Sequence, residues 1–190
     1  MNIVKLDEVE PHPWRNGGGI TRDLLAWPAV AEWQLRISVA EVTRDGPFSA
    51  YPGVERWFTV VQGAGVVLHF GDDDRRLAHE TLPLRFDGAA APGCTLIDGA
   101  TRDLNLLVRS DAGRGEMQVV APGADWRSAA PLRAVFTLFA AELRIDGLPA
   151  AALPAAALAW RPEAAGERWE LVPDDSRTRA WWMSFTPQRP

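Results

Sequence analysis

The apolar residues of this chain occur in short runs that glycine, proline and aspartate interrupt every few positions. Within 32–43 they alternate with other residues: Trp33, Leu35, Ile37 and Val39 fall on one side, Gln34, Arg36, Ser38 and Ala40 on the other. A period of two is that of a β-strand. Long helical periods are absent, and prolines interrupt the alanine-rich stretch 148–160. Many short strands with turn residues between them predict an all-β sandwich or barrel.

Further strands are expected at similar spacing along the chain. They cover 3–6, 20–27, 56–62, 65–70, 77–86 (two strands parted by Pro83), 94–97, 103–109, 133–145 (two strands), 168–172 and 180–186. Gly63-Ala64 predicts a hairpin between 56–62 and 65–70. Proline, glycine, aspartate and serine concentrate at 121–130, which predicts a seam between an N-terminal part, 1–125, and a smaller C-terminal part, 126–190. An exchange of terminal strands between the two parts stays open.

Three consecutive glycines interrupt the chain just before the second expected strand, in Pro-Trp-Arg-Asn-Gly-Gly-Gly-Ile-Thr-Arg-Asp over 13–23. Glycine loses the most backbone freedom on folding, so such a run fits a place with positive φ or a close backbone approach. The stretch matches neither a phosphate-binding loop nor a dinucleotide fingerprint. Two interpretations stay open, a tight turn into the strand and part of a binding site.

The composition excludes several classes of protein. Of the 190 residues 47% are hydrophobic, which suffices for a core, and the net charge of −5 argues against nucleic-acid binding. Cys94 is the single cysteine and is expected in the core. The N-terminus shows no secretory signal, and no apolar run approaches the roughly 20 residues of a membrane span. We therefore expect a cytoplasmic protein without membrane contact.

Two expected strands carry polar residues on one face, Gln34-x-Arg36-x-Ser38 and Asp103-x-Asn105-x-x-x-Arg109. An antiparallel sheet often has one solvated face, so simple exposure is the first interpretation. The second is a polar barrel interior, in which Arg36, Ser38 and Asn105 converge on a small polar ligand.

No catalytic or metal-binding motif is apparent. The three histidines, His12, His69 and His79, are scattered, and neither a His-x-His pair nor a Gly-x-Ser-x-Gly elbow occurs. We expect no bound metal and no cofactor.

The stretch 13–23 and the segments after it resemble the HutD/Ves family. The shared motifs are the glycine stretch, Trp33-x-x-Arg36-x-Ser38-x-Ala40-x-Val42, Asp45-Gly46-Pro47-Phe48-Ser49, Pro52-Gly53-x-x-Arg56, Gly63-x-Gly65, Pro83-x-x-Phe86-x-Gly88 and Gly99-x-x-x-Asp103-x-Asn105-x-x-x-Arg109. The resemblance implies a cupin-type double-stranded β-helix with two barrels packed together, a bicupin, that lacks the usual metal-ligand histidines. It also implies a role in histidine utilisation. Arg15 stands where lysine is commoner in the family.

The polar faces and the family motifs together predict one ligand site. Asn16, Thr21, Arg36, Ser38 and Asn105 are expected to line it, with Trp14, Phe48 and Arg56 at or near its rim. Arg36 would bind a carboxylate through two parallel hydrogen bonds.

We expect a binding protein with a regulatory role rather than an enzyme. Its ligand would be a small anionic metabolite of histidine utilisation, of the urocanate or formyl- or formimino-glutamate type. The alternatives are a metal-independent enzyme that uses the same pocket and a degenerate barrel that serves as an interaction module. Whether the protein forms a homodimer stays open.

Overall fold

The computed structural model describes residues 1–121, 123–174 and 179–188. Pro122, within the predicted seam, lies outside this part. The described chain is all-β, and its helical segments are two 3-10 turns, η1 (Leu6–Glu8) and η2 (Gly88–Ala90). By its contacts the chain forms two compact units, Glu10–Gly113 and Met1–Val9 together with Arg114–Pro190. The division therefore comes before the segment at which the composition predicts the seam.

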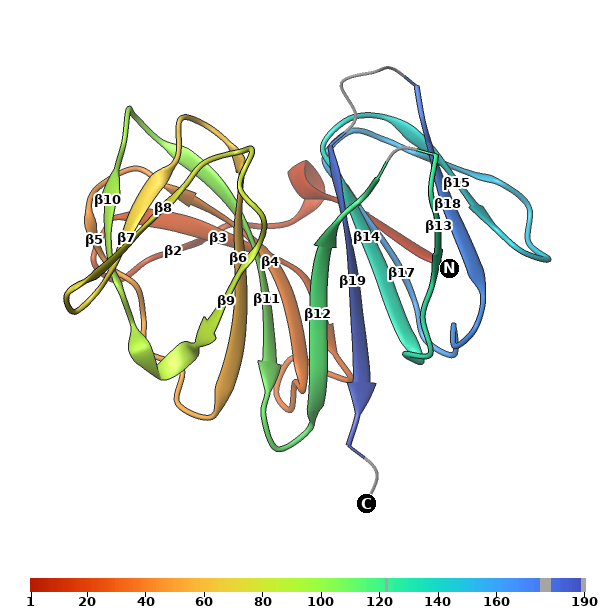
Figure 1. Cartoon of the computed structure of the whole chain (residues 1–190), viewed down its shortest axis with the longest axis horizontal. Helices are drawn as coiled ribbons and strands as arrows, with labels where there is room; N and C mark the ends of the chain where they lie inside the picture. Colours follow the sequence, from red (N-terminus) through yellow and green to blue (C-terminus); the bar gives the residue numbers. More distant parts are fainter. Residues whose placement is uncertain (122, 175–178, 189–190) are drawn as a thin grey trace. The chain divides into compact units, whose positions relative to one another are not determined.

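The unit Glu10–Gly113 consists of two antiparallel sheets (Figure 1). The larger has the strand order β2 (His12–Pro13), β3 (Gly19–Trp27), β4 (Leu35–Val42), β11 (Thr101–Arg109), β6 (Val54–Gln62) and β9 (Leu84–Asp87). The smaller has the order β5 (Gly46–Pro47), β10 (Gly93–Leu96), β7 (Val66–Phe70) and β8 (Asp73–Leu77). A core lies between them, because its buried residues come from both sheets: Val42, Phe58 and Val60 from one, Val66, Leu68, Leu77 and Cys94 from the other. Cys94 is thus a core residue, as predicted.

The predicted hairpin at Gly63-Ala64 is wrong. β6 pairs with β11 and β9, whereas β7 pairs with β10 and β8 in the other sheet. Gly63 and Gly65 both have positive φ. A Cβ at Gly63 would collide with the carbonyl of Ala100, and one at Gly65 with the carbonyl of Leu77. These glycines therefore let the chain pass from one sheet to the other in a tight space, which local turn chemistry alone does not distinguish from a hairpin.

The second unit also has two antiparallel sheets. One has the order β1 (Asn2–Lys5), β17 (Ala157–Arg161), β14 (Leu132–Thr137), β19 (Ala180–Pro187) and β12 (Gly113–Val119). The other has the order β13 (Asp125–Arg127), β18 (Arg168–Pro173), β15 (Ala141–Ile145) and β16 (Ala151–Leu153). Trp126, Trp169 and Trp182 pack together in its core. The alternation in the sequence did not predict β12, β13, β16 and β17.

Candidate functional site

Strand register brings the polar residues of the larger sheet into one row. Ser38 of β4 lies opposite Asp23 of β3 on one side and opposite Asn105 of β11 on the other. Directly opposed residues of paired strands share a face. Ser38 and Asn105 are only 3% and 2% exposed. The polar face is therefore an interior surface, which decides between the two interpretations of the sequence.

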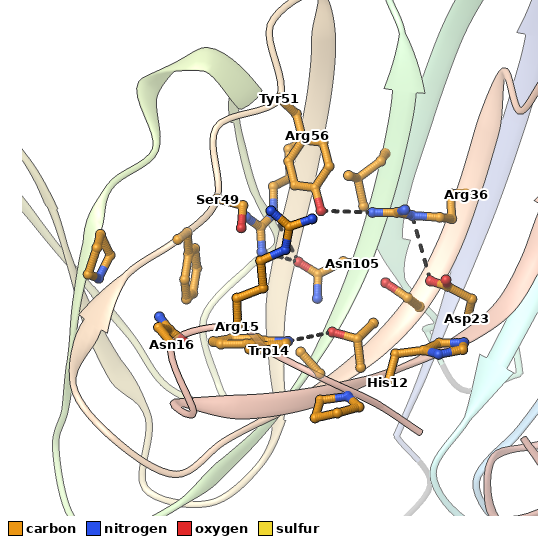
Figure 2. A pocket seen from close by; sticks show the side chains of 17 residues that line it. His12, Trp14, Arg15, Asn16, Asp23, Arg36, Ser49, Tyr51, Arg56 and Asn105 are labelled. Atoms are coloured by element: carbon orange, nitrogen blue, oxygen red, sulfur yellow. Dashed lines mark hydrogen bonds and ion pairs between the residues drawn. The ribbon is translucent and has the colours of Figure 1, made fainter. Parts of the chain in front are cut away.

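This face is the floor of a cavity of about 490 Å³ in the unit Glu10–Gly113. Figure 2 shows the side chains around it, among them three arginines that reach the cavity from different segments. The structure places all eight predicted residues in its lining: Trp14, Asn16, Thr21, Arg36, Ser38, Phe48, Arg56 and Asn105. Their convergence comes from the sheet register and from two segments, 12–16 and 47–51, that begin in the short strands β2 and β5 and continue as loops. Whether they bind a ligand stays a prediction.

The glycine stretch forms the turn that carries one wall of the cavity. The Nε1 of Trp14 donates to Oγ1 of Thr21 at 2.8 Å, across the turn. Asn16 accepts a hydrogen bond from the backbone N–H of Gly18 at 3.0 Å through Oδ1, which shapes the loop from within. Gly17 has φ +69°, and a Cβ at Gly19 would collide with the carbonyl of Glu41 on β4. The glycines therefore form a tight turn, and the residues on either side of them line the cavity.

Arg56 is the most deeply placed cation of the cavity. Its side chain is buried, with the residue 7% exposed, and its Nε and Nη2 donate to Oδ1 of Asn105 at 3.0 and 2.6 Å. The guanidinium lies 4.5 Å from the ring centre of Phe48 and 5.5 Å from that of Phe86. Burial lowers the pKa of Arg56 to about 10. The sequence predicts this residue near the rim; the structure places it deeper, because β6 carries it onto the interior face and aromatic rings surround it.

The amide of Asn105 is held in the orientation that serves Arg56. Its Nδ2 donates to the backbone carbonyl of Asp103 at 3.1 Å, which leaves Oδ1 to face the guanidinium. Asp103 itself is fully buried and accepts from Thr101 Oγ1 at 3.0 Å. Burial raises the pKa of Asp103 to about 7. The hydrogen-bonded partner of Arg56 is thus a neutral amide. Asp103 acts on the pKa of Arg56 through its charge, but no carboxylate among the described residues forms an ion pair with Arg56.

Arg36 is held by protein partners on several sides. Its Nη2 donates to the hydroxyl of Tyr51 at 3.1 Å, and its Nε lies 3.6 Å from Oδ1 of Asp23. The guanidinium is stacked near the rings of Trp33 and Tyr51, with 5.1 and 5.3 Å to their centres. These contacts, several of which Figure 2 shows, orient Arg36 toward the cavity.

Sequence reasoning missed five polar residues of the lining, which are His12, Arg15, Asp23, Ser49 and Tyr51. Asp23 follows Thr21 by two positions on β3, so the strand period could have found it. Arg15 belongs to the glycine stretch, and in Figure 2 its side chain extends across the cavity. No sequence pattern indicated that Tyr51 lines the cavity, because its position depends on how the loop after β5 folds over the sheet.

The donor set of the cavity suits an anion. Three guanidinium groups face one carboxylate, together with hydroxyl and amide groups. Transition metals need clustered imidazole, thiolate or carboxylate ligands. The residues that line the cavity do not form such a cluster. Within the described part of the chain no three histidine, cysteine, aspartate or glutamate residues are grouped to hold a metal. No helix among those residues is long and apolar enough to cross a membrane.

The fold and the interior site define a cupin-like protein. An oxalate decarboxylase from Lactobacillus farciminis has the same fold, with a TM-score of 0.64 at 9% identity over 98% of this chain and 86% of that one. The HutD family model matches residues 6–164, and the chain belongs to this family.

Individual relatives agree with this assignment. HutD from Pseudomonas fluorescens SBW25 is 26% identical, with a TM-score of 0.86 over 99% of both chains. Protein Ves of Citrobacter koseri is 33% identical over 121 residues, which is 63% of each chain. An uncharacterised 21.2 kDa protein in the hutC 3′ region of Pseudomonas putida is 28% identical over 62% of this chain and 63% of its own length. The matched parts of Protein Ves and of the Pseudomonas putida protein thus span less than two thirds of the length of each.

Proposed function

We propose that the chain binds a small carboxylate metabolite in the cavity and acts as a sensor or regulator rather than as a catalyst. The observation that carries this proposal is the buried guanidinium of Arg56, which lines the cavity and has a neutral amide as its hydrogen-bonded partner. Burying a cation without a paired anion is unfavourable. A ligand carboxylate would supply the missing negative charge.

The other charged groups support an anionic ligand. Arg15, Arg36 and Arg56 line the cavity together with one aspartate, Asp23, so the formal charge of the lining is positive while that of the whole chain is −5. A guanidinium offers parallel donors that match a carboxylate. A cavity of about 490 Å³ has the size of a small-molecule site.

The family connection suggests which carboxylates to test. The relative in the hutC 3′ region points to histidine utilisation, whose intermediates include urocanate, formiminoglutamate and formylglutamate. We propose a ligand of this type and a cytoplasmic regulatory role, with both units acting as cupin barrels. Turnover of such a compound would instead favour a metal-independent enzyme.

Calorimetric titration of urocanate and N-formyl-L-glutamate into the wild type and the Arg56→Met variant tests the proposal. Methionine keeps much of the volume and removes the charge. Loss of a charged hydrogen-bond partner should cost about 2 kcal/mol or more, which is roughly a thirtyfold loss of affinity. Arg102→Met is a matched control, because Arg102 is exposed and pairs with Glu41 outside the cavity lining. Unchanged affinity in Arg56→Met, or no binding by the wild type, would contradict the proposal.

A further inference from the structure

Asp23 is the single acidic residue in the cavity lining. Its Oδ1 is buried and lies 3.6 Å from Arg36 Nε, and neither of these two atoms has a hydrogen-bond partner among the residues that the structure describes. The side chain is 34% exposed. It borders the cavity, as Figure 2 shows. The carboxylate therefore keeps acceptor capacity that no described protein donor uses.

The cavity has two chemically different ends. At one end the Arg56 guanidinium is bonded to Asn105, and at the other Asp23 accompanies Arg36. β4 separates β3 from β11, so the backbones of Asp23 and Asn105 are two strand spacings apart, about 10 Å. Ser38 lies between them in the same row. A small ligand that reaches both ends meets only donors at the Arg56 end, whereas the other end offers a carboxylate acceptor beside the guanidinium of Arg36.

We propose that Asp23 determines specificity by accepting a hydrogen bond from an N–H group of the ligand. An ionised carboxylate is an acceptor only, so a ligand oxygen placed against Asp23 rather than against Arg36 would be repelled. The ligand class is thus a small carboxylate that also carries an amine-derived or ring N–H, in preference to a plain carboxylic acid of similar size. This inference rests on the proposed function, because it assumes that the carboxylate occupies the Arg56 end.

Pairs of probes with and without the N–H group test the proposal. Urocanate is compared with 3-(furan-3-yl)acrylate, in which a furan replaces the imidazole, and N-formyl-L-glutamate with glutarate. Hydrogen bonds to charged groups contribute enough for about a tenfold preference or more for the N–H member of a pair. Asp23→Ala should reduce that preference to about twofold or less, and Asp23→Asn, which keeps an amide oxygen, to an intermediate value.

Controls separate a specificity role from a structural one. Asp72→Ala removes a carboxylate from an exposed turn outside the cavity and should leave the preference intact. If Asp23 merely positions Arg36, Asp23→Ala will weaken both members of a pair equally, and the unchanged ratio overturns the proposal. Equal affinities for both members in the wild type also overturn it, while loss of binding in Arg56→Met still upholds the carboxylate site. If the wild type binds none of the four probes, the proposed function fails and this inference fails with it.

Discussion

Asp103, a single residue close to the site, shows how burial changes the pKa of a carboxyl group. It is fully buried on the interior face, and its Oδ1 has no hydrogen-bond partner among the described residues. Burial raises the pKa of this carboxyl from 3.8 to about 7, although the hydrogen bond from Thr101 and the charge of Arg56 both act to lower it. The folded protein therefore holds a proton here that the unfolded chain releases near pH 4.

A pH-dependent stability follows from this carboxyl. Between pH 4 and pH 7 the folded state binds the extra proton, so the free energy of unfolding falls as the pH rises through this window. Asp103→Asn removes the titration. The variant should match the wild type near pH 5 and exceed it at pH 8 by on the order of 2 kcal/mol. Urea denaturation at the two pH values measures this. Asp72→Asn, in an exposed turn, is the control, and an Asp103→Asn variant that is less stable at pH 8 would contradict the assignment.

At the scale of the element, the three glycines before β3 meet different requirements. Gly17 has positive φ but open space around it, whereas Gly19 lacks the space for a Cβ because the carbonyl of Glu41 approaches. Gly18 lies between them and donates its backbone N–H to Asn16. The run therefore combines one conformational and one steric requirement within three residues.

These two requirements predict different costs. Gly17→Ala should lower the free energy of unfolding by about 1–2 kcal/mol, the cost of a left-handed conformation for a residue with a Cβ. Gly19→Ala should cost more, because the pairing of β3 with β4 must open to relieve a collision with backbone. Chemical denaturation of the two variants compares them, with Gly71→Ala as a control of similar φ and open surroundings. Equal losses in all three variants would show that the approach to Glu41 is not limiting.

At the scale of the whole molecule, each unit contains a buried arginine with a different environment. Arg133 of β14 donates to the backbone carbonyls of Trp126, Ala164 and Glu167, and its guanidinium lies 4.0 Å from the ring centre of Trp126. Burial lowers the pKa of Arg133 to about 10, as it does for Arg56. The protein supplies three carbonyls to Arg133 but one amide oxygen to Arg56. Arg133 is therefore held by protein acceptors on several sides, whereas Arg56 lines the cavity.

Substitution by methionine should therefore affect stability to different extents in the two units. Arg133→Met leaves three buried carbonyls without donors and should lower the free energy of unfolding by about 2–4 kcal/mol. Arg56→Met leaves only Oδ1 of Asn105 without its donors and also removes a buried cation without an ion-pair partner, so the ligand-free protein should lose less stability than Arg133→Met does. Thermal unfolding without ligand measures both. A loss in Arg56→Met as large as that in Arg133→Met would make Arg56 a structural residue.

Much of the fold and of the site could be predicted from the sequence, because the information is local. The alternation within 32–43 placed Arg36 and Ser38 on one face, and that of 103–109 placed Asn105. A period of two is a property of each strand by itself, independent of its partner. The family motifs added Trp14, Asn16, Thr21, Phe48 and Arg56, and the structure brings all eight to one cavity. Strand periodicity and the family motifs thus determined the all-β class and eight residues of the lining.

Only the tertiary structure decided which strands pair and which of these side chains contact one another. β6 pairs with β11 rather than β7, because sheet pairing depends on contacts between distant segments and not on the turn that joins two strands. The same pairing carries Arg56 into the interior and places Asn105 against it. Tyr51 reaches Arg36 through a loop whose course no periodicity describes. Burial and hydrogen-bond partners, which distinguish Arg56 in the cavity from Arg133 among backbone carbonyls, are properties of the packed molecule and not of the residue.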